Sequence, residues 1–284
     1  MPTAFATPAA ARPGRVTSIP EALAGLYRSE PIFTIAGLVL LAAMVPTAMA
    51  GIVDDRTLHG IDIWLKPLKF HFALTVYLLT LAFYARWLPA GMTARTGYRF
   101  YAGAVVAAIA AETLWISGAA AHGVASHFNE ATPLMAALYS VMGVLAILLT
   151  SATAVYAVAI ARNPAAHLPP AGRLALVLGL ALVLPLTLVT ALTLAQNGGH
   201  WVGGVPDDAG GLPLMGWSRD GGDLRVAHFF ATHAMHFLPA FGLVSIRLFG
   251  PDRRWPVVAF AALYTVATGL VFLQALSGQP FLAG

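Results

Sequence analysis

The sequence predicts an all-α integral membrane protein, built as a bundle of seven transmembrane helices with the N-terminus inside and the C-terminus outside. Of its 284 residues, 58% are hydrophobic and only 10% are charged, whereas a soluble domain has about 25% charged residues. The mean hydropathy is +0.76. Seven apolar stretches each approach the roughly 20 residues that a helix needs to cross the hydrocarbon layer.

The chain divides into an N-terminal tail and one membrane domain. Residues 1–30 are rich in alanine, proline and arginine, so we expect a flexible tail. Ser18 and Glu21 have the spacing of a capping box, which predicts a short interfacial helix over Ile19–Ser29. The transmembrane domain then covers residues 31–284. Its predicted spans are Ile32–Ile52, Leu65–Trp87, Tyr98–Ala121, Leu134–Ala161, Leu174–Ala195, Val226–Phe249 and Trp255–Ser277.

The positions of the basic residues predict the orientation. Loops on the cytoplasmic side of a membrane protein carry an excess of lysine and arginine. With the N-terminus inside, eleven of the 16 lysines and arginines fall on inner segments and five on outer ones. The outer loop over residues 196–224 is long, acidic and glycine-rich, and such loops are often binding loops. We therefore expect it to cover an outward-facing site.

The histidines are concentrated near the outer side. With this orientation, eight of the nine histidines lie on or near the outer side, and only His167 lies inside. The ones within or at the edge of spans are His71, His228, His233 and His236. A helix rises 1.5 Å per residue, which places His71, His233, His236 and Glu112 about 8 to 16 Å below the outer edge. We expect these side chains to share one layer between the second, third and sixth spans.

These residue types indicate ligand binding. Neutral imidazole is the commonest metal and haem ligand, and ionisable side chains inside a membrane are functional candidates by default. The predicted metal or haem ligands are His71, His127, His228, His233 and His236. The candidate catalytic residues, as base or proton carrier, are Glu112 and His127. The candidates for holding a carboxylate or phosphate are Lys66, Lys69 and Arg225.

Each of these assignments has a structural alternative. The histidines could be hydrogen-bonded core residues, and Glu112 could be a protonated carboxyl that serves packing. The two lysines could extend to the lipid headgroups. We also expect Asp223 to cap the sixth span rather than to orient His228.

The cofactor that these residues suggest is a b-type haem or a transition metal ion, with zinc, copper and iron left open. The chain has no cysteine, which excludes thiolate ligands, Fe–S clusters and c-type haem attachment. A bis-histidine haem would pair His71 or His127 with His233 or His236, whereas a non-haem centre would gather three or four histidines with Glu112. The predicted function is a membrane redox protein or oxidoreductase. Its expected partners are the lipid bilayer and a small-molecule or quinone-like substrate, without nucleic acid.

Two other functions stay open. A proton-coupled or anion transporter would use Glu112 and the histidines as a proton relay. It ranks second because a transporter needs a path to both sides, and the inner halves of the spans are almost wholly apolar. A membrane metallo-hydrolase acting on a lipid-like substrate would use a metal-bound water with Glu112 or His127 as base.

Three short motifs resemble a known family. The motif KPLKF begins at Lys66, SHFN begins at Ser126, and GDLRVAHFFATH ends at His233. This combination resembles an uncharacterised bacterial family of polytopic membrane proteins over the second to sixth spans, and no activity comes with it. Among the candidates, the resemblance favours His127, His228 and His233. With the seven spans it implies a multi-pass protein of the bacterial inner (cytoplasmic) membrane.

The predicted orientation can be tested with reporter fusions. A reporter fused after the last residue is expected to be active only outside the cytoplasm, because seven spans separate the two termini. The same reporter inserted after Ala165, in a predicted inner loop, is expected to be active only inside. A cytoplasmic signal from the C-terminal fusion would reverse the depth assignments of the histidines.

Overall fold

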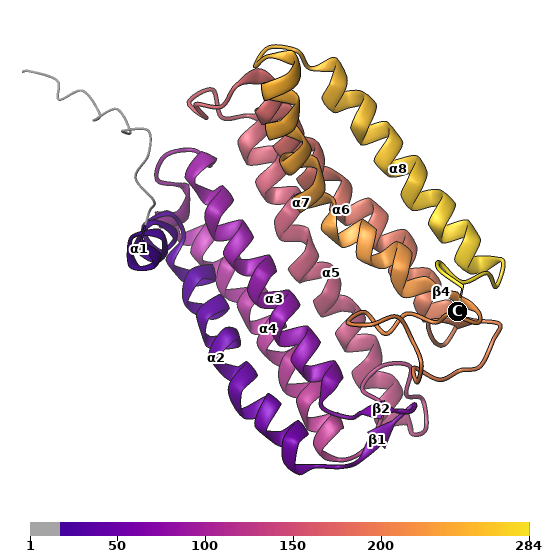
Figure 1. The fold of residues 1–284 in the computed structure, drawn as a ribbon. Helices are drawn as coiled ribbons and strands as arrows, with labels where there is room; N and C mark the ends of the chain where they lie inside the picture. The colour runs from indigo at the N-terminus through magenta and orange to yellow at the C-terminus, as the bar shows by residue number, and fades with distance from the viewer. Residues whose placement is uncertain (1–17, 284) are drawn as a thin grey trace, which may run out of the picture.

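A computed structural model describes residues 18–283 as an all-α bundle, with seven helices long and apolar enough to cross a membrane (Figure 1). These helices are α2 (Pro31–Val53), α3 (Leu65–Tyr84), α4 (Thr96–Ala121), α5 (Pro133–Ala161), α6 (Pro170–Gln196), α7 (Leu224–Phe249) and α8 (Trp255–Leu276). Short 3-10 turns, η1 (Ala85–Trp87) and η2 (Met92–Ala94), lead from α3 to α4. Helices α2, α5 and α6 begin at a proline, whose fixed φ and missing N–H suit the first helical turn. The predicted seven-helix bundle is confirmed.

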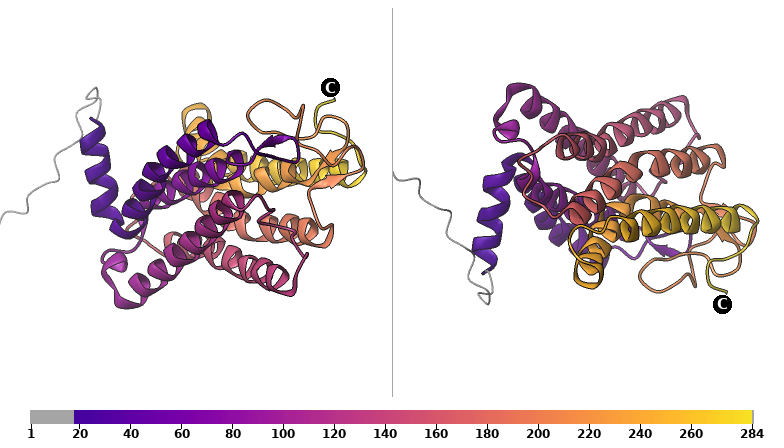
Figure 2. Two further views of the ribbon diagram at one scale, coloured as in Figure 1. Left: turned by 90° about the horizontal axis from the view of Figure 1, so that it is seen from below. Right: turned by 90° about the horizontal axis from the view of Figure 1, so that it is seen from above.

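Helix α1 (Ile19–Ser29) precedes the bundle. The predicted capping box is present: Ser18 N donates to Glu21 Oε2 at 3.0 Å, and Glu21 N donates to Ser18 Oγ at 3.4 Å. The helix lies across the end of the bundle, roughly perpendicular to the long helices (Figure 2). The remainder of the predicted tail, residues 1–17, lies outside the described residues.

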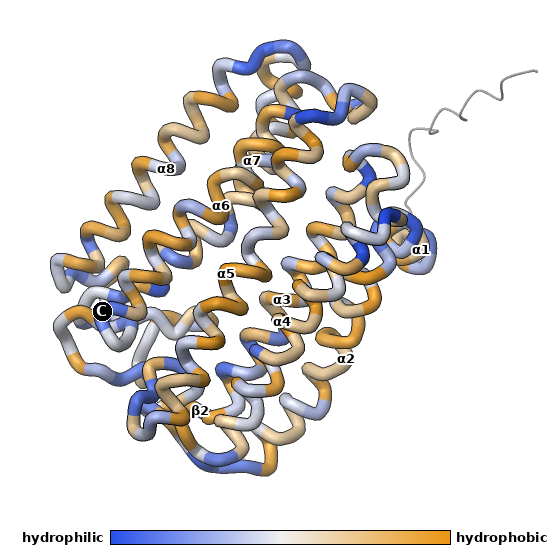
Figure 3. Tube along the Cα trace, turned by 180° about the vertical axis from the view of Figure 1, so that it is seen from behind, coloured by the Kyte–Doolittle hydropathy of each residue, from blue (hydrophilic) through white to orange (hydrophobic). Residues whose placement is uncertain are grey.

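The long helices form two groups. Figure 1 shows α2, α3 and α4 on one side and α6, α7 and α8 on the other, with α5 between them. We call the end with the C-terminus the outer end, following the predicted orientation, and the end with α1 the inner end. Hydrophilic residues concentrate at these two ends, while the helices between them are mostly hydrophobic (Figure 3).

The most extensive helix packing joins α6 to α7. A Cβ on Gly179 would lie 2.9 Å from the Ala234 carbonyl oxygen and 2.9 Å from Pro239 Cδ. In membranes, small residues let helix backbones approach closely, since packing rather than hydrophobic burial drives their association. The α6–α7 pair therefore fixes the helix that carries His228, His233 and His236.

A short hairpin closes the outer end between α2 and α3. Strands β1 (Thr57–Leu58) and β2 (Ile61–Asp62) pair antiparallel across a two-residue turn. The turn residues His59 and Gly60 have φ values of 50° and 75°. Positive φ at both positions matches a type I′ turn, whose twist suits a hairpin.

The long outer loop is closed by a second pair of strands. β3 (Trp201–Val202) pairs antiparallel with β4 (Gly222–Asp223), which brings the two ends of the loop together. Gly222 lies against the last turn of α8, where a Cβ would collide with the Ala275 carbonyl. The loop is therefore fixed both to the start of α7 and to the end of α8.

Substitution of Gly179 by alanine tests the α6–α7 contact. The added methyl group meets backbone that cannot rotate away, so we expect Gly179→Ala to lower the free energy of unfolding by about 1–3 kcal/mol. Gly143→Ala in α5 is the matched control, because a Cβ there meets no atom within 4 Å. Equal thermal stability of the two variants in detergent would contradict the tight packing.

Candidate functional site

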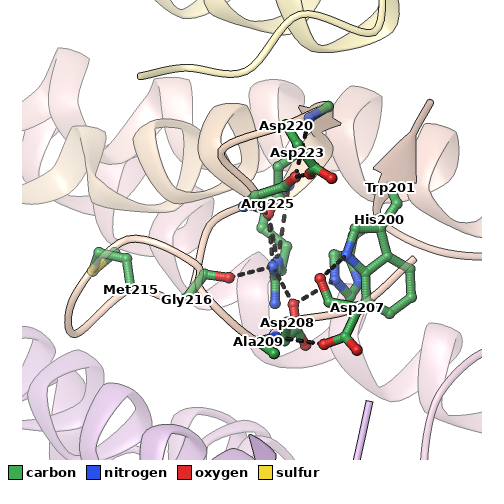
Figure 4. Close-up of polar contacts among 12 residues, drawn as sticks. His200, Trp201, Asp207, Asp208, Ala209, Met215, Gly216, Asp220, Asp223 and Arg225 are labelled. Carbon is green, nitrogen blue, oxygen red and sulfur yellow. Dashed lines mark hydrogen bonds and ion pairs between the residues drawn. The ribbon is translucent and has the colours of Figure 1, made fainter. Parts of the chain in front are cut away.

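Arg225, the second residue of α7, holds the outer loop in place (Figure 4). Its guanidinium donates to Asp208 Oδ1 at 2.7 Å, to Asp223 Oδ2 at 2.6 Å and to the Gly216 carbonyl at 2.7 Å. Asp223 is only 1% exposed and accepts from Arg225 N at 2.9 Å, so the predicted helix cap is confirmed. Charge-assisted hydrogen bonds are about twice as strong as neutral ones. One cation thus connects three points of the loop.

Asp208 extends this network to the hairpin of the other helix group. Its carboxylate accepts from His200 Nε2 at 3.2 Å, and its backbone N–H donates to the His59 carbonyl at 2.9 Å. Burial alone would raise the pKa of Asp208, but the His200 hydrogen bond and the Arg225 charge bring it below its usual value. Burial lowers the pKa of His200. The imidazole is therefore neutral near pH 7, and its contact with Asp208 is a hydrogen bond rather than an ion pair.

Lys66 and Lys69 are cations without a carboxylate partner. Lys69 Nζ donates to the Met215 carbonyl at 3.1 Å, beneath the outer loop. Within residues 18–283, neither lysine forms an ion pair. The charges that act on Lys66 are those of Arg225, Asp208 and Glu112. The two aspartates around Arg225 carry one negative charge more than the arginine balances, but neither forms an ion pair with a lysine in the described part of the chain. The two half-buried lysines therefore remain available to an anion.

Two histidines of α7 are held through Nδ1. His233 Nδ1 lies 2.8 Å from the Phe229 carbonyl, which can only accept, so this nitrogen carries the proton. His228 Nδ1 lies 3.0 Å from Thr190 Oγ1, whose hydroxyl already donates to the backbone of α6. Nε2 of both histidines therefore keeps its lone pair. Ligating histidines in metalloproteins are oriented by the same kind of hydrogen bond.

His71 does not face the histidines of α7. Its Nδ1 lies 3.3 Å from Thr47 Oγ1, which donates to the Ala43 carbonyl, so His71 points towards α2. Thr80, nine residues later and therefore on the opposite side of α3, meets His236 of α7 at 3.1 Å. The predicted pairing of His71 with His233 or His236 is not formed, because the hydroxyl on α2 is the polar partner that His71 reaches.

His233 and His236 form the pair that faces α3. Their ring centroids are 5.3 Å apart, and the Phe229 ring stacks on His233 with a centroid distance of 3.9 Å. His236 Nε2 contacts Thr80, while its buried Nδ1 has no hydrogen-bond partner among the described residues. Next to this pair, the Tyr84 hydroxyl donates to the Met235 carbonyl at 2.8 Å and links α3 to α7.

The two candidate catalytic residues lie on the α4 side. Burial, with a smaller effect of Lys66, lowers the pKa of His127 to about 3. His127 is therefore neutral at physiological pH and a weak base, whereas an effective general base titrates near the working pH. Glu112 is 4% exposed, and its Oε1 has no hydrogen-bond partner within residues 18–283. Lys66 is the charge that acts on it.

The predicted multi-histidine metal centre is not formed by the residues that the structure describes. Among residues 18–283, no three His, Cys, Asp or Glu side chains lie close enough to hold a metal ion. The reason is the direction of each ring. His71 turns to α2, His228 turns to α6, and His127 packs against the aromatic rings of Phe70 and Tyr139.

The comparisons with known proteins identify no family. No protein-family model, curated protein or solved structure matches the chain. The motif resemblance to a bacterial membrane-protein family stays a prediction.

The site contains residues that the sequence did not single out. Asp208 and the threonines that orient the histidines, Thr47, Thr80 and Thr190, belong to segments other than those of their partners. A threonine in an apolar span is a weak signal by itself, since its hydroxyl can bond to its own helix. Only the tertiary structure identifies these pairs, through the contacts of α2 with α3, of α3 with α7, of α6 with α7, and of the outer loop with α7.

The two aspartates around Arg225 are expected to differ in how much each contributes to the free energy of unfolding. Asp223→Asn removes a fully buried acceptor of Arg225 and of Ser218 N, so we expect a loss of about 3 kcal/mol in the free energy of unfolding. Asp208→Asn leaves Arg225 with its main partner and is expected to lose about 1 kcal/mol and to increase proteolysis of the loop. Thermal unfolding in detergent measures both, with the exposed Asp252→Asn as control. Equal losses would contradict the central position of Asp223.

Proposed function

We propose that this protein binds a b-type haem at its outer end and acts as a membrane redox protein. The observation that carries the proposal is His233. Its Nδ1 donates to the Phe229 carbonyl, and its Nε2 keeps a free lone pair within the outer half of a membrane helix. Haem iron is commonly held by one such histidine.

The residues present fit a haem with one protein imidazole. Lys66 and Lys69 are cations without a carboxylate, and the two haem propionates are carboxylates that need such partners. Phe229 stacks on His233, and Trp217 packs against Phe229 at a centroid distance of 5.5 Å, which supplies aromatic surface. His71 would not join His233 in holding the haem, because its Nδ1 meets Thr47 of α2.

The haem, when bound, supplies one-electron transfer. The chain's own residues would bind and orient it. Phe229 fixes the ring of His233 through its carbonyl, and the lysines hold the carboxylates near the outer surface. The outer loop, anchored by Arg225, limits the access of water to the site. A membrane metallo-hydrolase finds less support, since the described residues gather no three metal ligands.

One observation favours a second candidate, a proton-coupled or anion transporter. The inner halves of the spans are almost wholly apolar in the sequence, but two of their hydroxyl groups come together in the structure. The hydroxyls of Tyr98 and Tyr156 meet at 2.7 Å in the interior. A transporter needs polar groups towards both sides, and the anion site at Lys66 and Lys69 would then bind its cargo.

An absorption spectrum of detergent-purified protein tests the proposal. The expected result is a Soret band that sharpens on reduction. His233→Ala is expected to lose most of the haem, because it removes the ligand. His167→Ala is the matched control, since that histidine is exposed near the inner end. The double variant Lys66→Gln, Lys69→Gln is expected to weaken haem binding roughly tenfold or more through loss of the propionate partners.

Two outcomes would contradict the haem assignment. Full haem occupancy in His233→Ala would place the axial ligand elsewhere. A wild-type protein that takes up no haem on reconstitution would reject the proposal, and lysine-dependent uptake of an organic anion by proteoliposomes would then support the transporter.

A further inference from the structure

Glu30 is a buried carboxyl group near the inner end, far along the chain from the proposed haem site. It lies between α1 and α2, its side chain is 0% exposed, and it caps α2 by accepting from Phe33 N. Only Oε2 takes part in the cap. Oε1 is buried and has no hydrogen-bond partner among residues 18–283. A buried carboxylate oxygen without a donor is costly, and protonation removes that cost.

The groups around Glu30 are hydroxyls rather than cations. Tyr98 of α4 is the titratable residue that acts on it, and the Tyr98 hydroxyl meets that of Tyr156 of α5 at 2.7 Å. On α1, Arg28 is exposed and makes no ion pair within residues 18–283. In the described part of the chain, the groups that act on Glu30 thus include a hydroxyl that can exchange a proton and no cation, although Arg99 lines a neighbouring hollow.

A surface hollow adjoins these residues in the chain. It has a volume of about 360 Å³ and is lined by Ile32, Thr96, Arg99 and Phe100. Ile32 lies two residues after Glu30, and Arg99 follows Tyr98 directly. A hollow of this size holds several water molecules. Its lining residues neighbour Glu30 and Tyr98 in the sequence, and Glu30 itself lies behind them.

We propose that Glu30, with the Tyr98–Tyr156 hydroxyl pair beside it, is a proton-binding site reached from the hollow at the inner end. In the binding step, one O–H bond of a hydronium ion in the hollow breaks, an O–H bond forms at the Glu30 carboxylate, and a water molecule remains in the hollow. The site goes beyond the proposed haem function and does not depend on it.

The burial of Glu30 determines whether its contribution to stability rises or falls with pH. Burial raises the pKa of Glu30 to about 7, against 4.5 for an ordinary glutamate. Between these values the native state binds more protons than the unfolded state, so stability falls as pH rises from about 4.5 to about 7. Above that window the contribution of Glu30 is constant.

The variant Glu30→Gln separates proton binding from helix capping. The glutamine carbonyl can still accept from Phe33 N, but the side chain no longer titrates. Infrared spectra of the wild type are expected to show a protonated-carboxyl band that disappears as pH rises through about 7. Glu112 is a second buried carboxyl with an Oε1 that has no partner among the described residues, so Glu30→Gln should lose the Glu30 part of this band and of the fall in melting temperature, whereas Glu112→Gln should keep that part. Glu130→Gln, at an exposed outer position, is the control and should keep both.

A second variant keeps the proposal testable if Glu30→Gln does not fold. Tyr98→Phe retains the ring but removes a hydroxyl that lowers the pKa of Glu30, so the midpoint of the carboxyl band should move to higher pH. Thr96→Trp, which fills the hollow, should slow deuterium exchange of the carboxyl. A carboxyl band and a pH-dependent melting temperature that are unchanged in Glu30→Gln, or an unchanged midpoint in Tyr98→Phe, would overturn the proposal.

Discussion

Inside the hydrocarbon layer no water is available, so each polar side chain needs a partner within the protein. This requirement determines the direction of nearly every histidine in the outer half of the bundle. His71 turns to a threonine of α2, His228 turns to a threonine of α6, and His233 turns to the carbonyl one turn before it in α7. The orientation of the imidazoles is thus a consequence of helix packing. Between α6 and α7, small residues allow this close packing.

Some buried polar atoms remain without a hydrogen-bond partner. Among the described residues, these include Glu112 Oε1, His236 Nδ1 and Glu30 Oε1. Unsatisfied buried polar atoms are rare in native structures and often mark a functional position. The first two lie beside the lysines and His233 at the outer end, and the third lies near the inner end. They are therefore the places where a ligand or a proton would complete the hydrogen bonding.

The charged residues at the outer end show which side chains have partners within the protein and which could bind a ligand. Arg225 is fully paired by two aspartates and serves to fix the loop. Lys66 and Lys69, in the first turns of α3, form no ion pair within residues 18–283. Lys69 contacts the outer loop through the Met215 carbonyl, and half-buried cations without an ion pair are also suited to headgroups or to an anion. The lysines, rather than the arginine, are thus the residues around which an anionic ligand would bind.

The sequence by itself determined the seven spans, the helix over Ile19–Ser29 and the cap at Asp223. These features depend on local composition and spacing, because the bilayer demands a continuous apolar helix and a cap needs a side chain within a few residues. Only the tertiary structure decided which histidines face each other. A helix places a side chain on a known face of its own cylinder, but its neighbour is set by the packing of other helices. The sequence therefore paired His71 with α7, whereas its Nδ1 meets Thr47 of α2 in the structure. Glu30 was overlooked, since nothing in a sequence shows that a glutamate between two helices will be buried.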